Sequence, residues 1–200
     1  MYRIARFPYI TAFPAVNDAV KWRAWEAQKA AYALAGKLWA APLEERVVPS
    51  EFGGLPVYVR VPTSAKEEGG SNKWPVVVLM TGLDGYRPDN TTRCDEFLKR
   101  GWAAVVVEIP GTADCPADSG DPEAPDRLWT SLLAWMGRDG RFDMRRVMVW
   151  GLSCGGYYAV RIAHTHREQL AGCVGQGAGC HYFFDREWLA RVGGHEYPFQ

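Results

Sequence analysis

The sequence predicts an α/β fold built on a mostly parallel β-sheet, and three observations support this prediction. Short, continuous apolar runs, typical of strands buried on both faces, occur at 75–81, 102–107, 146–150 and 170–174. Helical patterns separate them, at 91–100, from Asp121-Pro122 to Met136, and at 154–165. Loops rich in glycine and proline join the segments. Strands that alternate with helices indicate parallel strands with helices on both faces.

The N-terminal part predicts a long helix over 15–40, ended by Pro42. Apolar residues recur every three to four positions, among them Val20, Leu34 and Leu38, and predict the buried stripe. Aromatic side chains such as Trp25 add apolar surface on other faces. A helix this apolar needs something to pack against, so we expect 1–42 to be the end of a helical cap or lead-in.

A β-hairpin is expected between this helix and the parallel strands. Its two segments are 46–52 and 55–61, and Gly53-Gly54 is the predicted turn because glycine tolerates positive φ. Residues 63–74 are polar and include Gly69-Gly70, so they predict an exposed loop.

Composition excludes several classes of function. The formal net charge is zero, so the electrostatic footprint of a nucleic-acid binder is absent. No apolar run reaches the roughly 18 residues of a membrane span, and no secretory signal is recognisable. Five cysteines without a CxxC motif argue against a disulfide framework or a zinc site. We therefore expect a cytoplasmic protein with free thiols, without a metal or other cofactor. The aromatic content of 13% fits core packing, and also a pocket for a flat, partly polar ligand.

Ser153 is the predicted nucleophile. It lies in Gly151-Leu152-Ser153-Cys154-Gly155, a G-x-S-x-G pattern between the third apolar run and a helix. In this arrangement a sharp turn lifts the serine Oγ above the sheet, and the glycines leave room for the turn. The pattern in this context predicts the α/β-hydrolase fold, with 43–200 as the N-terminal part of its core.

An oxyanion hole is the second requirement of acyl transfer, since negative charge develops on a former carbonyl oxygen. One backbone N–H donor is expected from Cys154, which follows the nucleophile. The second is expected from the loop after the first apolar run, where Gly82 allows close approach of the backbone. We predict Leu83 N–H as this donor; a plain glycine turn is the alternative.

The acid and the histidine of the triad are harder to place. In this fold the order is Ser, then Asp or Glu, then His. His164 and His166 fall on the helix after the nucleophile and should point away from it, as surface or capping residues. Asp185 and His195 come later, but no further strand separates them. We therefore expect the acid and histidine beyond Gln200, together with the C-terminal strands of a partial hydrolase core.

Four stretches carry a more specific resemblance: TGLDGYRPD (81–89), EIPGTADCPAD (108–118), APDRLW (124–129) and GLSCGGYYAVRIAHTH (151–166). They resemble the fungal yellowish-green pigment hydrolases, which are related to the FrsA-like esterases and pseudooxynicotine hydrolases. The resemblance covers about residues 15–200 and is most specific in the last stretch. It implies hydrolytic shortening of an aromatic polyketide by cleavage of a carbon–carbon bond next to a carbonyl, in pigment and melanin biosynthesis. Ser153 matches the family's nucleophile.

Two other functions stay open. A carboxylesterase or a prolyl-peptidase-like serine hydrolase would have a similar motif around Ser153. A non-catalytic, truncated remnant is the alternative from a different class, since the triad acid and histidine are not evident in the sequence. The expected partner is a small polyketide-like molecule, with no nucleic acid, and a homodimer is compatible with these observations.

Overall fold

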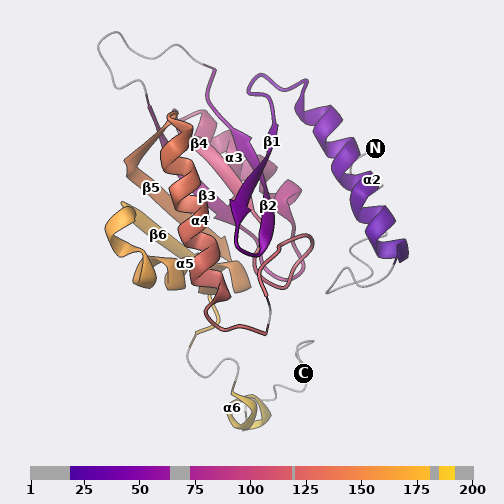
Figure 1. The fold of residues 1–200 in the computed structure, drawn as a ribbon, viewed down its shortest axis with the longest axis vertical. Helices are drawn as coiled ribbons and strands as arrows, with labels where there is room; N and C mark the ends of the chain where they lie inside the picture. Colours follow the sequence, from indigo (N-terminus) through magenta and orange to yellow (C-terminus); the bar gives the residue numbers. More distant parts are fainter. Residues whose placement is uncertain (1–18, 64–72, 119, 181–184, 192–200) are drawn as a thin grey trace.

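A six-stranded mixed sheet forms the centre of the protein (Figure 1). The computed structural model describes residues 19–63, 73–118, 120–180 and 185–191. The strands are β1 (Glu44–Ser50), β2 (Gly53–Arg60), β3 (Trp74–Met80), β4 (Ala103–Val107), β5 (Phe142–Leu152) and β6 (Gly172–Gln176). Their order in the sheet is β1-β2-β4-β3-β5-β6. The helices are α2 (Ala19–Gly36), α3 (Thr91–Leu98), α4 (Ala124–Asp139), α5 (Cys154–Thr165) and α6 (Arg186–Arg191), with short 3₁₀ turns at η1 (Arg87–Asn90) and η2 (Arg167–Gln169).

The predicted α/β architecture is confirmed. Strands β3, β4, β5 and β6 are parallel, and the β1–β2 hairpin joins them antiparallel through β4. The carboxyl ends of parallel strands meet at one edge of a sheet. The loops after β3 and β4 therefore lie at the same edge as the turn after β5, which carries Ser153.

Side chains of the central strands alternate between two apolar layers. On β3, Val76 and Val78 belong to the layer that contains α4 and α5, with Leu128 and Ile162 among its buried residues. Val77 belongs to the opposite layer, which contains α3 and a residue of α2. Figure 1 shows α4 and α5 across one face of the sheet and α3 on the other. Because both faces of these strands are buried, their sequences are continuous apolar runs.

The hairpin turn differs from the prediction. Ser50 pairs with Gly53, so Glu51 and Phe52 make the turn and the two glycines begin β2. Gly53 has φ of +107°, a conformation that glycine adopts readily. At Gly54 a Cβ atom would overlap the side chain of Val47 on β1. The turn therefore lies two residues earlier than expected, and the two glycines suit the strand pairing that follows it.

The N-terminal helix buries a different face from the predicted one. Trp25, Gln28 and Tyr32 are buried, whereas Val20 and Leu34 of the expected stripe are 66% and 65% exposed. Aromatic side chains bury more apolar area than valine or leucine, and their polar atoms can reach partners on the core. Tyr32 stacks on Tyr58 of β2 at 5.2 Å between ring centroids, and its hydroxyl lies 2.7 Å from Thr91 Oγ1.

The helix and strand limits also differ at several ends. Helix α2 ends at Gly36, before Pro42, because Gly36 packs directly on Leu43. Helix α4 begins at Ala124, and Asp121 instead accepts a hydrogen bond from Glu123 N–H. Residues 1–18 and 64–72 of the expected helix and loop lie outside the described residues. None of the described helices has the length and apolarity that a bilayer crossing requires.

Candidate active site

Ser153 occupies a strained turn between β5 and α5. Its φ and ψ are +56° and −124°, and within the described ranges it shares positive φ with only one other non-glycine residue. Non-glycine residues in such conformations cost of order 1–3 kcal/mol and persist where the surroundings hold them. A Cβ atom on Gly151 would overlap the backbone of Gly155, and one on Gly155 would overlap the carbonyl of Thr81. The flanking glycines are therefore a steric requirement of this turn.

Backbone hydrogen bonds fix the turn on both sides. Ser153 N–H donates to Gln176 O at the end of β6 (2.8 Å), and Gly156 N–H donates to Ser153 O (2.8 Å). A Cβ atom on Gly156 would lie 3.0 Å from Gln176 O, so β6 packs closely on the start of α5. Ser153 itself is exposed. The serine is thus held rigidly at the sheet edge and is open to a substrate.

The loop after β3 contacts the predicted nucleophile directly. A Cβ atom on Gly82 would lie 2.7 Å from Ser153 Cβ and 3.0 Å from its Oγ. Leu83 comes next, in a turn, and its side chain packs against the layer below. Cys154 is the first residue of α5, so no carbonyl within the helix can accept its N–H. Both predicted oxyanion donors therefore belong to backbone beside Ser153, and their role stays a prediction.

The Cys154 thiol is half-buried next to the serine. Burial raises the pKa of this thiol, and a hydrogen bond with the Ser153 side chain lowers it by a smaller amount. The thiol therefore stays protonated at neutral pH. This leaves the Ser153 hydroxyl as the nucleophile candidate at this turn.

The two described histidines lie far from this serine. His166 caps the C-terminal end of α5, roughly 20 Å along the helix from Ser153 at 1.5 Å per residue. Its ring nitrogens lie 2.9 Å from Thr130 Oγ1 and 2.7 Å from Thr165 Oγ1, and burial lowers its pKa. His164, two residues earlier, is exposed. These placements agree with surface and capping roles.

The weaker candidates for the acid and base are only partly described. Asp185 Oδ1 accepts a hydrogen bond from Trp188 N–H (2.6 Å) and so caps the short helix α6. His181 and His195 lie outside the described residues. In the described ranges, no three His, Cys, Asp or Glu side chains are grouped so that they could hold a metal ion.

A recess lies beside α5, one turn after the serine. It has a volume of about 280 Å³ and is lined by Pro110, Asp118, Asp121, Pro122, Pro125, Tyr157, Tyr158 and Arg161. Tyr157 N–H donates to Ser153 O (3.3 Å), which places this wall next to the nucleophile turn. Asp126 holds Arg161 through two hydrogen bonds of 2.8 Å, so the cation is fixed at the rim. Proline and tyrosine surfaces suit a flat, partly polar ligand.

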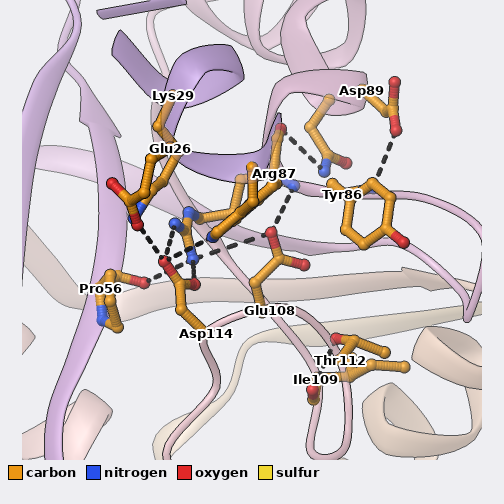
Figure 2. Close-up of polar contacts among 12 residues, drawn as sticks. Glu26, Lys29, Pro56, Tyr86, Arg87, Asp89, Glu108, Ile109, Thr112 and Asp114 are labelled. Atoms are coloured by element: carbon orange, nitrogen blue, oxygen red, sulfur yellow. Dashed lines mark hydrogen bonds and ion pairs between the residues drawn. The ribbon is translucent and has the colours of Figure 1, made fainter. Parts of the chain in front are cut away.

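A buried charge cluster at the same sheet edge was not expected from the sequence (Figure 2). Arg87 and Glu108 are each 1% exposed, and Arg87 N–H donates to Glu108 Oε1 (2.8 Å). Burial raises the pKa of Glu108 to about 7, although Arg87 opposes this shift. Asp114 binds the guanidinium, and Arg87 and Lys29 hold its pKa below the usual range despite burial. The sequence feature that could have indicated this cluster is the position of Glu108, a charged residue directly after a buried strand.

Comparison with solved structures identifies the fold. The structure named AbyA5 Wildtype superposes with a TM-score of 0.77 at 22% identity, over 94% of this chain and 50% of that one. The chain has the α/β-hydrolase fold. The turn at Ser153 follows a strand, where this fold places its nucleophile elbow, and the role of Ser153 stays a prediction.

Two curated proteins are similar in sequence to this chain. Hydrolase acrC of Aspergillus aculeatus is 30% identical over 142 residues, which are 66% of this chain and 32% of the relative. The 2,6-dihydropseudooxynicotine hydrolase of Paenarthrobacter nicotinovorans is 28% identical over 149 residues, which are 73% of this chain and 38% of the relative. The chain thus spans about a third of the length of these relatives. No protein-family model matches it.

Proposed function

We propose that this protein, which has the α/β-hydrolase fold, is a serine hydrolase with Ser153 as its nucleophile. One observation carries the proposal: an exposed serine, held at positive φ after a strand, with the Gly82 backbone against its Oγ. A plain structural turn requires neither the strain nor the close approach of a second loop. Both distant relatives are named as hydrolases, which agrees with this chemistry.

The proposed reaction is an acyl transfer to water. Ser153 Oγ attacks a substrate carbonyl and loses its proton to a general base, while Cys154 N–H and Leu83 N–H stabilise the oxyanion. The bond from the carbonyl carbon to the leaving group then breaks, and the leaving group takes up the proton. Water hydrolyses the resulting ester and releases the acid and free Ser153. We propose a histidine as the base, oriented by an acid.

For the substrate we propose an aromatic polyketide, cleaved at a carbon–carbon bond next to a carbonyl. The leaving carbanion is then stabilised as an enolate or phenolate before protonation. The recess at Tyr157 and Tyr158, walled by prolines, supports a flat ring with hydroxyl groups next to the nucleophile. The proposal also draws on the resemblance of residues 151–166 to polyketide-shortening hydrolases.

The test combines labelling with a substrate panel, using the full-length protein. A fluorophosphonate probe should label Ser153, and Ser153→Ala should abolish labelling without unfolding the protein. Ser131→Ala is the matched control, because that hydroxyl only bonds the Arg127 carbonyl in its own helix. Folded wild-type protein that resists labelling would refute a competent nucleophile and favour a non-catalytic protein.

The panel separates the enzyme alternatives. An aryl diketone or naphthopyrone should be cleaved faster than a p-nitrophenyl ester or a prolyl peptide. Preference for the ester would replace the proposed substrate class with a carboxylesterase while leaving the role of Ser153 in place.

A further inference from the structure

The cluster in Figure 2 links the N-terminal helix to the loop at the nucleophile. Its centre is Asp114, in the loop after β4. Arg87 binds both carboxylate oxygens, with Nη1 to Oδ1 at 2.5 Å and Nη2 to Oδ2 at 3.0 Å. This two-point contact fixes the plane of the guanidinium as well as its position. Arg87 Nη1 also donates to the carbonyl of Pro56 on β2 (3.3 Å).

Helix α2 supplies two more donors to the same carboxylate. Trp25 Nε1–H and Lys29 Nζ each donate to Asp114 Oδ2 at 3.2 Å. Trp25 is fully buried, and its ring also lies 5.5 Å from the Arg87 guanidinium. Glu26 pairs with Lys29 from the solvent side at 2.8 Å. Asp114 therefore holds α2 and Arg87 together.

Arg87 also fixes one end of the loop at the nucleophile. The neighbouring residue Tyr86 is 1% exposed and packs on Trp25 with ring centroids 5.4 Å apart. Only the residues between Gly82 and Tyr86 separate this anchored end from the contact with Ser153. A short loop fixed at one end has few ways to move at the other. The position of Gly82 and Leu83 thus depends on where Tyr86 and Arg87 are held.

Backbone strain at the cluster shows that its geometry is imposed. Ala113, next to Asp114, has φ of +43°, and it packs against the Trp25–Tyr86 pair. On its other side, Thr112 donates to Ile109 O from N–H (3.1 Å) and from Oγ1 (2.7 Å). A non-glycine residue keeps such a conformation only where its surroundings determine it. The contacts around Asp114 provide those surroundings.

We propose that Lys29 and Trp25 are positioning residues: acting through Asp114 and Arg87, they hold the Gly82–Leu83 backbone in place at Ser153. Helix α2 is then part of the support of the active site. This inference rests on the proposed serine hydrolase function for its kinetic consequence, whereas the effect on the loop does not depend on catalysis.

The experiment substitutes residues of α2 and measures hydrogen exchange in the loop at residues 82–86 of the full-length protein. Lys29→Gln removes the positive charge that pairs with Asp114 from α2 and leaves the buried Arg87–Asp114 pair intact. Glu26→Gln is the control, because it breaks the Lys29–Glu26 pair without touching Asp114. Lys29→Arg is the conservative variant, which should retain the wild-type exchange and rate because it keeps the positive charge. Trp25→Phe independently removes the second donor and keeps most of the apolar ring.

Three measurements are made on each variant: hydrogen exchange of residues 82–86, turnover of p-nitrophenyl butyrate, and melting temperature. For Lys29→Gln we expect faster exchange in this loop and kcat lowered about 10-fold at nearly unchanged KM, since a small displacement of catalytic groups is costly. The melting temperature should stay within about 4 °C, as for loss of a partly exposed ion pair. Lys29→Arg and Glu26→Gln should match wild type.

Unchanged exchange of residues 82–86 in both Lys29→Gln and Trp25→Phe would overturn the inference, whatever the activity. Exchange that rises equally across the whole chain would overturn it too, because the role would then be general stability. A folded wild-type protein that neither turns over p-nitrophenyl butyrate nor reacts with the fluorophosphonate probe would instead refute the proposed function, and the exchange data would still decide the positioning role.

Discussion

Substitution of Gly82 by alanine tests the contact between the loop after β3 and the nucleophile. The new Cβ would lie 2.7 Å from Ser153 Cβ and 3.0 Å from Oγ, with Leu152 O at 3.3 Å. An ordinary contact between carbon atoms is about 3.5–4.0 Å. The loop and the elbow must therefore separate by about 1 Å. Because φ of Gly82 is not in the positive range, the clash alone determines the effect.

The expected result is a large loss of rate with a moderate loss of stability. Overpacking of this kind costs about 1–3 kcal/mol. A misplacement of 1 Å in an active site can lower the rate about 100-fold. Hydrolysis of p-nitrophenyl butyrate and the rate of fluorophosphonate labelling measure the first effect, and urea unfolding measures the second.

Gly137→Ala is the matched control for this substitution. It makes the same chemical change within helix α4, at a position where a Cβ atom meets nothing within 4 Å. Its rate should equal that of wild type. A folded Gly82→Ala protein with the wild-type rate would refute the argument, because the loop would then not be held against Ser153.

Three further predictions concern stability. Gly137→Ala should raise the free energy of unfolding by about 1 kcal/mol, because alanine favours a helix interior; urea unfolding showing no gain would contradict this. Asp114→Asn should lower it by about 3–5 kcal/mol, since the buried Arg87 loses the carboxylate that binds it at two points, whereas the exposed Glu168→Gln should change it by less than about 1 kcal/mol. The folded pKa of Glu108 is raised from 4.5 to about 7, so its stabilising contribution is present below about pH 4.5 and is lost as the pH rises through 7. Unfolding at pH 5 and pH 8 should show wild type losing stability relative to Glu108→Gln; parallel values would contradict this.

The parts of the fold that could be predicted are those encoded by adjacent residues. A run such as 75–81 is apolar because both faces of β3 are buried, so composition alone reveals the strand. The elbow pattern is equally compact: Gly151 and Gly155 surround Ser153 within five residues. A Cβ atom on Gly151 would overlap the turn's own backbone, whereas one on Gly155 would overlap the carbonyl of Thr81. The expected position of the loop after β3 beside Ser153 agrees with the contact at Gly82, whereas its role as oxyanion donor stays a prediction.

The parts that could not be predicted depend on partners distant in the sequence. Asp114 is 89 residues from Trp25 and 27 residues from Arg87, and no periodicity relates these positions. Helix α2 shows the consequence. Judged alone, its aliphatic stripe with Val20 and Leu34 is the apolar face, but the core offers an acceptor for Trp25 and a ring for Tyr32.

The strained elbow has a recognisable sequence pattern, whereas the position of the loop opposite it depends on the buried cluster of distant residues. The elbow can be recognised from its own residues because the glycines that leave room for it lie within two positions of Ser153. The opposing loop carries only Gly82 as a local signal, and its position is set by Arg87, which depends on Asp114 and on α2. If that dependence holds, sequences with an intact G-x-S-x-G pattern can still differ widely in rate through residues on α2. A close match at residues 151–156 therefore predicts the nucleophile, whereas activity also requires the partners of Asp114.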